Sequence, residues 1–290
     1  MKASTIVGVA KPMGIVARNT VTETTLERPR QNSSEVLVRA ENVTLQYAAR
    51  ASVVTATWRV NFDVHYGDRY ILLGQSGCGK SSLLKAIGGF IRPSEGCISI
   101  RGAPINGPSP ERMMVFQEFD QLFPWKTVLE NVIFPMRARS WTRKDRIERA
   151  RSFIDKVGLT KFANAYPHTL SGGMKQRAAI ARAMAIEPDI LLMDEPFAAL
   201  DALTRARLQD ELLRLWEELR FTMLFVTHSI DEAVRVGSRI LVLSPHPGQV
   251  RAELNCPASG GQSEVKDFEQ WITSMLHETN SEQVAEGNAV

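Results

Sequence analysis

The amino-acid sequence predicts an α/β fold with a helical insertion, on the strength of three observations. Strand-like and helix-like patterns alternate along most of the chain, which favours a largely parallel sheet flanked by helices. The runs "DILLMD" (189–194) and "FTMLFVT" (221–227) are almost entirely apolar, as expected of strands buried on both faces. Between Thr127 and Ala185 the pattern is largely helical, which indicates an inserted helical unit.

The first part of the domain is predicted to be rich in strands. Residues 35–47 and 53–74 alternate apolar with polar positions and contain many β-branched side chains, which is typical of strands. A helix is expected from residue 80, closed by Gly88 and Gly89. Short strands are expected at 97–102 and 112–117.

The second part alternates helices with buried strands. The segments 144–158 and 202–220 are amphipathic and predict helices, and 229–237 predicts a short helix. The run "SRILVLS" (238–244) is expected to form the last strand. Beyond it, residues 265–277 place apolar side chains on one helical face, which either packs on its own domain, the interpretation we favour, or docks on a partner.

Composition sets the limits of the domain and of its partners. Residues 1–34 are interpreted as a disordered leader, 35–256 as the folded domain with a helical part at about 120–185, and 257–290 as an acidic tail with a short helix. The net charge of +3 is mild, so we expect no nucleic-acid partner. The chain has 3 cysteines without CxxC spacing, which argues against a zinc site.

A glycine-rich segment follows the apolar run "YILL" and opens a predicted helix. "GQSGCGKSS" fits the phosphate-binding pattern G-x-x-x-x-G-K-[ST], in the strand–loop–helix context that this pattern needs. Its glycines let backbone N–H groups surround phosphate oxygens, and the helix start adds partial positive charge. Lys80 is expected to reach the β- and γ-phosphates and Ser81 to bind Mg²⁺. The expected nucleotide-binding residues are Gly74, Gln75, Ser76, Gly77, Cys78, Gly79, Lys80, Ser81 and Ser82.

Polar side chains follow both buried strands. Asp194 is expected to hold Mg²⁺ through water, and Glu195 to take a proton from a water that attacks the γ-phosphate. His228 ends a strand expected to lie beside the strand of the phosphate loop, so it should reach the same phosphate. The alternative for Asp194 and Glu195 is a solvated strand end, and the alternative for His228 is a purely structural role. Both alternatives are less favoured because a phosphate loop is present in the same chain.

A second Gly-Gly element, "LSGGMKQR" (170–177), resembles the signature of ATP-binding cassette (ABC) ATPases. Further pieces occur in that family's order. These are Tyr47, the phosphate loop, Gln117, Leu170–Gly173, Asp194–Glu195, "AALD" (198–201) and His228. The resemblance covers roughly residues 36–250 and implies a P-loop ATPase core with a mixed sheet, an antiparallel β subdomain and a helical insertion.

The resemblance also implies how the parts work together. Two copies would associate head to tail and enclose two ATP molecules. The γ-phosphate held by one copy would face the signature residues of the other, Ser171, Gly172 and Gly173. Asp201 would lie at the dimer seam, that is, the interface between the two copies. Tyr47 would stack on adenine, and Gln117 would assist catalysis and the metal. The implied ligands are ATP and Mg²⁺.

Three departures from the family pattern leave the catalytic groups in place. Met174 stands where Gln is usual, Ala199 where Ser is common, and Ser82 where Thr is usual. Two other stretches, 117–132 and "SPHPGQV" (244–250), are similar to the ATPases of nitrate, sulfonate and taurine importers. The family resemblance therefore implies a peripheral subunit on the cytoplasmic face of a bacterial inner membrane.

Such a subunit would energise a separate membrane permease served by a solute-binding protein. The alternative is an ABC ATPase that acts outside transport as an ATP-driven dimer clamp; co-purification with a membrane protein would separate the two. Phe119, Phe123 and Trp125 are expected to be partly exposed and to line a groove for the permease, although core packing is the simpler interpretation. Cys78 is expected to point away from the nucleotide and to favour the thiolate form.

Overall fold

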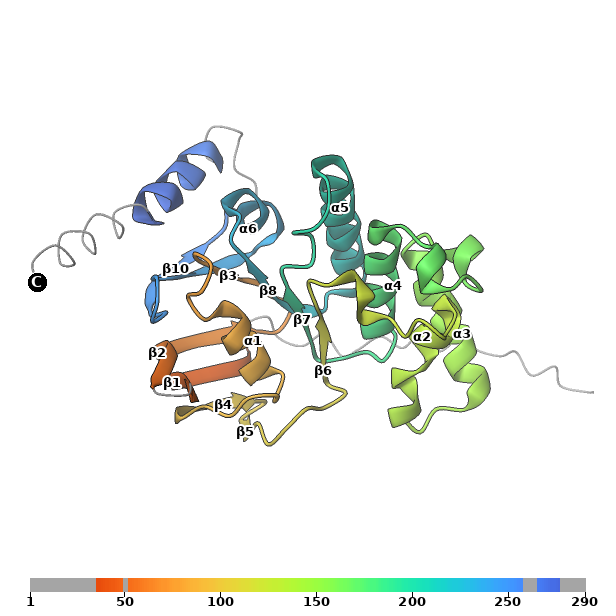
Figure 1. Ribbon diagram of the computed structural model, residues 1–290, viewed down its shortest axis with the longest axis horizontal. Helices are drawn as coiled ribbons and strands as arrows, with labels where there is room; N and C mark the ends of the chain where they lie inside the picture. The colour runs from red at the N-terminus through yellow and green to blue at the C-terminus, as the bar shows by residue number, and fades with distance from the viewer. Residues whose placement is uncertain (1–34, 49–51, 258–264, 277–290) are drawn as a thin grey trace, which may run out of the picture. The chain divides into compact units, whose positions relative to one another are not determined.

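A computed structural model describes residues 35–48, 52–257 and 265–276 of the chain. A six-stranded sheet runs through it in the order β10-β9-β3-β8-β7-β6, and all its neighbours pair in parallel except β10 with β9 (Figure 1). Its strands are β3 (Arg69–Leu73), β6 (Arg112–Val115), β7 (Ile190–Asp194), β8 (Thr222–Thr227), β9 (Arg239–Leu243) and β10 (Val250–Asn255). The phosphate-loop strand β3 lies between β8 and β9, as expected of a central strand.

A second, four-stranded sheet is antiparallel and has the order β2-β1-β4-β5. It contains β1 (Val36–Ala48), β2 (Val53–His65), β4 (Glu95–Ile100) and β5 (Ala103–Pro104). The buried side chains of β1 include Val38 and Ala40, and then Val43 and Leu45, two pairs with the two-residue spacing of a strand and a register shift between them.

The helices connect the strands of the larger sheet. They are α1 (Lys80–Ile87), α2 (Val128–Ile133), α3 (Arg143–Lys156), α4 (Gly172–Met184), α5 (Ala202–Leu219) and α6 (Ile230–Val236). Short 3-10 turns are η1 (Phe119–Gln121), η2 (Pro135–Ala138), η3 (Thr160–Phe162) and η4 (Pro167–Thr169). Helices α2 and α3 begin with capping boxes at Thr127 and Thr142, which satisfy backbone N–H groups that a helix start leaves free.

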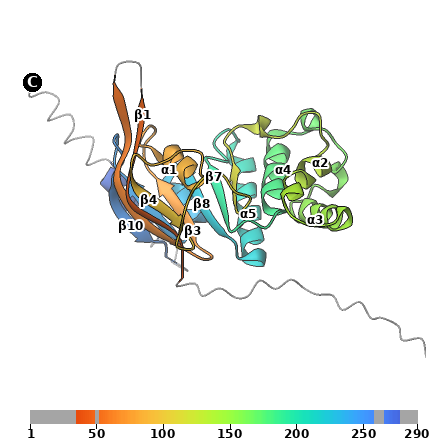
Figure 2. The ribbon, with the colours of Figure 1, turned by 90° about the horizontal axis from the view of Figure 1, so that it is seen from below.

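Helix α1 lies between the two sheets (Figure 2). Its residues Leu83, Leu84 and Ile87 share one core with the antiparallel sheet and with one face of the larger sheet. Along β3, Tyr70 and Leu72 belong to this core, whereas Ile71 and Leu73 belong to the core on the opposite face. The near-continuous apolar strands therefore cover both faces of the sheet, as predicted.

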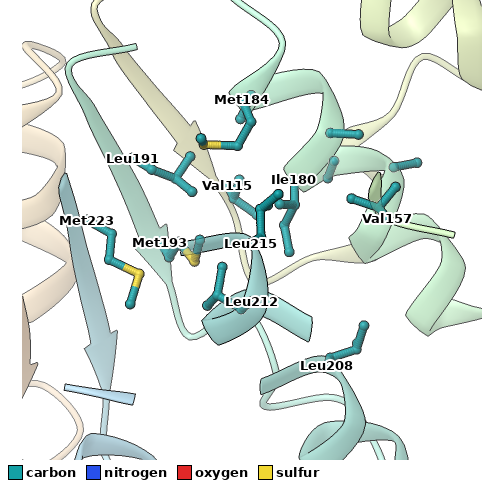
Figure 3. Packing of buried hydrophobic residues seen from close by; sticks show 14 of the residues in the cluster. Val115, Val157, Ile180, Met184, Leu191, Met193, Leu208, Leu212, Leu215 and Met223 are labelled. Atoms are coloured by element: carbon teal, nitrogen blue, oxygen red, sulfur yellow. The ribbon is translucent and has the colours of Figure 1, made fainter. Parts of the chain in front are cut away.

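The opposite core joins the sheet to the helical unit. Figure 3 shows Leu191 and Met193 of β7 packed among side chains of α4 and α5, including Ile180 and Leu212. The expected helical insertion is confirmed as α2, α3 and α4 with their 3-10 turns.

Two sequence expectations need correction. β9 is not the last strand, because β10 follows at the edge of the sheet. The sequence of β10, "VRAELN", is partly charged and at most half-buried, so it lacks the apolar pattern by which strands are predicted. The two-residue strand β5 was also missed. The helix at 265–276 packs on its own domain, since Ile272 is fully buried and Arg251 Nη1 donates to the carbonyl of Met275 at 2.8 Å. Residues 1–34 and 277–290 lie outside the described residues, so the leader and most of the tail are not tested.

Candidate functional site

The phosphate loop folds as a tight turn from the end of β3 into α1. Gly77 and Gly79 have φ angles of 85° and 90°, a region that glycine adopts far more easily than other residues. Ser76 and Gly77 are exposed at the crown of the loop. Lys80 is buried, and its Nζ donates to the carbonyls of Gly74 and Gln75 at 2.7 and 2.8 Å. Its ammonium group therefore lies against the loop where a phosphate is predicted to bind.

Cys78 corrects one sequence expectation. Its side chain is fully buried in the core beside α1, so it does point inward as predicted. Burial raises the pKa of the thiol, although the neighbouring Lys80 acts in the opposite direction. The predicted preference for thiolate is therefore wrong, because desolvation of the sulfur outweighs the positive charge of the loop.

Two of the three residues predicted to serve the metal, Ser81 and Asp194, meet at the end of β7. Ser81 Oγ donates to Asp194 Oδ1 at 2.7 Å. Burial raises the pKa of Asp194, and the hydrogen bond from Ser81 opposes this. Hydroxyl and carboxylate oxygens are ligands that Mg²⁺ accepts together with phosphate and water. No group of three or more acidic, His or Cys side chains converges among the described residues, and Mg²⁺ held largely by a nucleotide needs none.

Glu195 and His228 also meet, although they follow different strands. His228 Nδ1 lies 3.0 Å from Glu195 Oε2, at the adjacent ends of β7 and β8. Glu195 has a φ of 43°, and its N–H donates to the carbonyl of Val226 at 3.0 Å. A non-glycine residue at positive φ is uncommon and is often found at functional sites. The backbone of Glu195 is therefore held in an uncommon conformation at the point where the ends of β7 and β8 lie side by side.

Tyr47 is half-exposed at the end of β1, and its hydroxyl donates to Ser82 Oγ at 2.8 Å. The residue predicted to stack on adenine thus contacts the phosphate-loop helix. Its stacking role stays a prediction.

Gln117 follows β6 and is exposed at this same edge of the sheet. Its loop is closed by Gln121, a residue that the sequence did not single out. Gln121 Oε1 accepts from the N–H of Phe116 at 3.1 Å, and its Nε2 donates to the carbonyl of Glu118 at 3.0 Å. Gln121 Nε2 also contacts Gln176 Oε1 of α4 at 3.3 Å, so the Gln117 loop is tied to the signature helix.

The signature residues lie apart from the phosphate loop of their own chain. Ser171 caps α4 by accepting from the N–H of Met174, and Gly172 and Gly173 open the helix. In both ribbon views α4 lies on the other side of β7 from α1 (Figures 1 and 2). Asp201 is the N-cap of α5 and accepts from the N–H of Thr204 at 2.9 Å, which lowers the pKa of Asp201. This separation is what action on a second copy's nucleotide would require.

A turn between β9 and β10 packs on the phosphate loop, a contact that was not predicted from the sequence. Gly248 exchanges backbone hydrogen bonds with β2, from Trp58 N–H and to the Ala56 carbonyl, both of 2.9 Å. A Cβ atom at Gly248 would lie 2.0 Å from the carbonyl oxygen of Cys78. The "SPHPGQV" segment therefore packs against the phosphate loop at Gly248, a position where a side chain would collide with the backbone of Cys78.

Known proteins match this chain along most of its length. The family model described as ABC transporter matches residues 58–198. A taurine import ATP-binding protein of Rhizobium johnstonii is 44% identical over 220 residues, covering 76% of this chain and 84% of the relative. A nitrate import ATP-binding protein of Synechocystis is 41% identical over 221 residues, covering 76% of this chain and 83% of the relative.

The fold matches solved structures as well. A dimeric ATP-binding cassette in a post-hydrolysis state, bound to ADP and Pi, superposes with a TM-score of 0.66 at 33% identity. The match covers 77% of this chain and 100% of the other. With the phosphate loop, the paired acids and the signature in place, the chain belongs to the ABC transporter ATP-binding proteins, in the group that contains the taurine and nitrate import ATPases.

Proposed function

We propose that this chain hydrolyses ATP and thereby energises the import of a small solute, of the nitrate, sulfonate or taurine kind, through a separate membrane permease. The observation that carries the proposal is the meeting of four side chains from three segments at one edge of the sheet. Ser81 lies 2.7 Å from Asp194, and His228 lies 3.0 Å from Glu195. The side chains proposed to serve the metal and those proposed to activate water thus lie beside the proposed nucleotide site.

The proposed mechanism assigns each group one task. Lys80 and the loop N–H groups bind the phosphates. Ser81 and, through water, Asp194 would hold Mg²⁺, which would neutralise charge on the nucleotide. Glu195 accepts the proton of the attacking water, and His228 positions Glu195 and donates to the γ-phosphate. Gln117, on the loop that follows β6, helps to orient the water. Tyr47 stacks on adenine.

The proposed assembly contains two copies. Ser171, Gly172 and Gly173 of one copy contact the nucleotide held by the other, and Asp201 lies at the seam. Support comes from the position of α4 away from its own phosphate loop and from the dimeric state of the matched cassette. The signature helix starts against α5, since a Cβ at Gly173 would lie 3.1 Å from Thr204 Cγ2.

The permease is proposed to dock on an exposed aromatic cluster of Phe123, Trp125 and Phe134. Phe123 lies 5.6 Å from Trp125 and 4.7 Å from Phe134, measured between ring centroids. Trp125 is 70% exposed, so it is not a core residue as the simpler interpretation supposed. The side chain of Phe119 lies outside the described residues. No described helix is both long and apolar enough to cross a membrane.

Nitrate, a sulfonate or taurine is the proposed solute, because the import relatives are named for taurine and nitrate. The test is uptake into proteoliposomes that contain this chain, the permease and the solute-binding protein encoded beside its gene. ATP-driven uptake of labelled taurine or nitrate is expected with the wild-type chain and not with Ser171→Arg. A complex that hydrolyses ATP but moves neither solute would contradict the solute assignment. A chain that associates with no membrane protein would contradict the import function.

A further inference from the structure

Glu232 is a buried carboxylate that none of the predicted motifs uses. It lies on α6 and is 5% exposed. Burying a carboxylate costs free energy unless hydrogen bonds and opposite charges compensate for the lost water. The contacts of its two oxygens therefore indicate what the residue does.

One oxygen holds the turn that carries His228. Thr227 Oγ1 donates to Glu232 Oε2 at 2.6 Å, and the same hydroxyl accepts from the N–H of Ser229 at 3.0 Å. Ser229 Oγ in turn accepts from the N–H of Glu232 at 3.3 Å. The residues on both sides of His228 are thus fixed to Glu232.

The other oxygen holds α5, the helix that starts at the predicted dimer seam. Gln209 Nε2 donates to Glu232 Oε1 at 3.3 Å, and Arg205 Nε lies 3.7 Å from the same oxygen. Arg205 Nη2 also donates to the carbonyl of Leu200 at 3.0 Å, directly before Asp201. One carboxylate therefore bridges the Asp201 turn and the His228 turn.

From this bridge we infer that Glu232 is a positioning residue that couples the dimer seam to His228, an inference that rests on the proposed function. When a second copy closes on Asp201, any shift of the first turn of α5 passes through Arg205 and Glu232 to Thr227. His228 follows Thr227 and lies 3.0 Å from Glu195. Closure of the dimer thereby sets the position of the proposed catalytic base.

A purely structural role makes a different prediction, which double mutants can measure. Because Arg205 and Thr227 share Glu232 as a partner, their effects on stability can couple whatever the role of the bridge, so the informative quantity is kcat. If the two contacts positioned His228 independently of each other, their effects on kcat would add. Residues that act as one unit are instead non-additive, because breaking either half already breaks the link.

The kinetic test uses the full chain with Thr227→Val, Arg205→Gln, both together, and Glu232→Gln. Each single change is expected to lower kcat about tenfold or more while the Kd for MgATP stays within about twofold. The double variant should be no slower than the slower single variant. Arg214→Gln, an exposed change on the same helix, is the matched control and should keep wild-type kcat. Additive losses, or unchanged kcat, would overturn the inference.

A second readout does not depend on ATP hydrolysis. The imidazole signal of His228 can be followed by NMR with isotope-labelled histidine and assigned by its loss in His228→Gln. Arg205→Gln should move this signal in the wild-type chain but not in the Glu232→Gln background. An unmoved signal in Arg205→Gln alone would overturn the coupling. A wild-type chain without MgATP hydrolysis would contradict the proposed function instead, and the NMR result would still decide the coupling.

Discussion

The hydroxyl of Ser81 donates a hydrogen bond of 2.7 Å to Oδ1 of Asp194, which joins the first turn of α1 to the end of β7. The two residues are far apart in the sequence, and both are partly or fully removed from water. Burial raises the pKa of Asp194. A cation that binds beside this pair would favour the charged carboxylate, so metal binding and ionisation of Asp194 should support each other.

Asp194→Asn should weaken the binding of Mg²⁺ before it weakens the binding of ATP. The amide keeps the shape of the side chain and loses its charge. We expect the Mg²⁺ concentration for half-maximal ATPase to rise about tenfold or more, the usual cost of losing a group that supports a metal through water. Asp210→Asn, on the exposed face of α5, is the control. An unchanged Mg²⁺ titration would remove Asp194 from the metal site.

Gly248→Ala should displace the phosphate loop and thereby weaken the binding of MgATP. The new Cβ would lie 2.0 Å from the carbonyl oxygen of Cys78, so the loop or the β9–β10 turn must shift. Overpacking of this kind costs about 1–3 kcal/mol of stability. Calorimetric titration with MgATP should show weaker binding, whereas Gln249→Ala in the same turn should bind normally. Equal binding by both variants would show that the turn does not support the loop.

Cys78 should react slowly with alkylating reagents in the folded chain. The side chain is fully buried, and burial raises the pKa of its thiol, so little thiolate forms at neutral pH. Cys97 is exposed and should be labelled first, as mapped by mass spectrometry. Labelling of Cys78 should become fast only on unfolding. Fast labelling in the native chain would indicate that the phosphate loop opens readily without nucleotide.

Trp125→Ala should separate hydrolysis from assembly. Because the indole is 70% exposed, its loss should leave the melting temperature and the ATPase rate of the free subunit nearly unchanged. Co-purification with the permease should be lost, since exposed aromatic side chains are frequent anchors of interfaces. Trp271→Ala, which removes another half-exposed indole, is the control. Normal assembly of the Trp125 variant would exclude this cluster as the docking surface.

Most of the fold could be predicted because its strands are short, apolar and separated by clear turn signals. The two-sided burial of β7 and β8 and the loop before α1 leave strong local patterns. The edge strand β10 and the two-residue β5 leave weak ones, since few of their side chains are buried.

The supporting residues of the site were not predictable in the same way. Glu232 and Gln121 act through partners that lie far away in the sequence, and no local pattern marks them. Gly248 lies in the stretch 244–250 that the family resemblance marked, but its contact with the phosphate loop was not predicted. The pKa of Cys78 was predicted with the wrong sign because a sequence shows nearby charges but not the depth of burial. Motif residues therefore come from the sequence, whereas the contacts that position them require the structure.

The most direct test of the central claim is the MgATPase rate of Glu195→Gln, measured beside the size of the protein with and without ATP. Since Glu195 is proposed to accept the proton of the attacking water, hydrolysis should fall by at least about a hundredfold. ATP should still bind, because the amide keeps the size of the side chain, and the bound ATP should hold two copies together on size exclusion. Hydrolysis near the wild-type rate, or a variant that stays monomeric with ATP bound, would contradict the account.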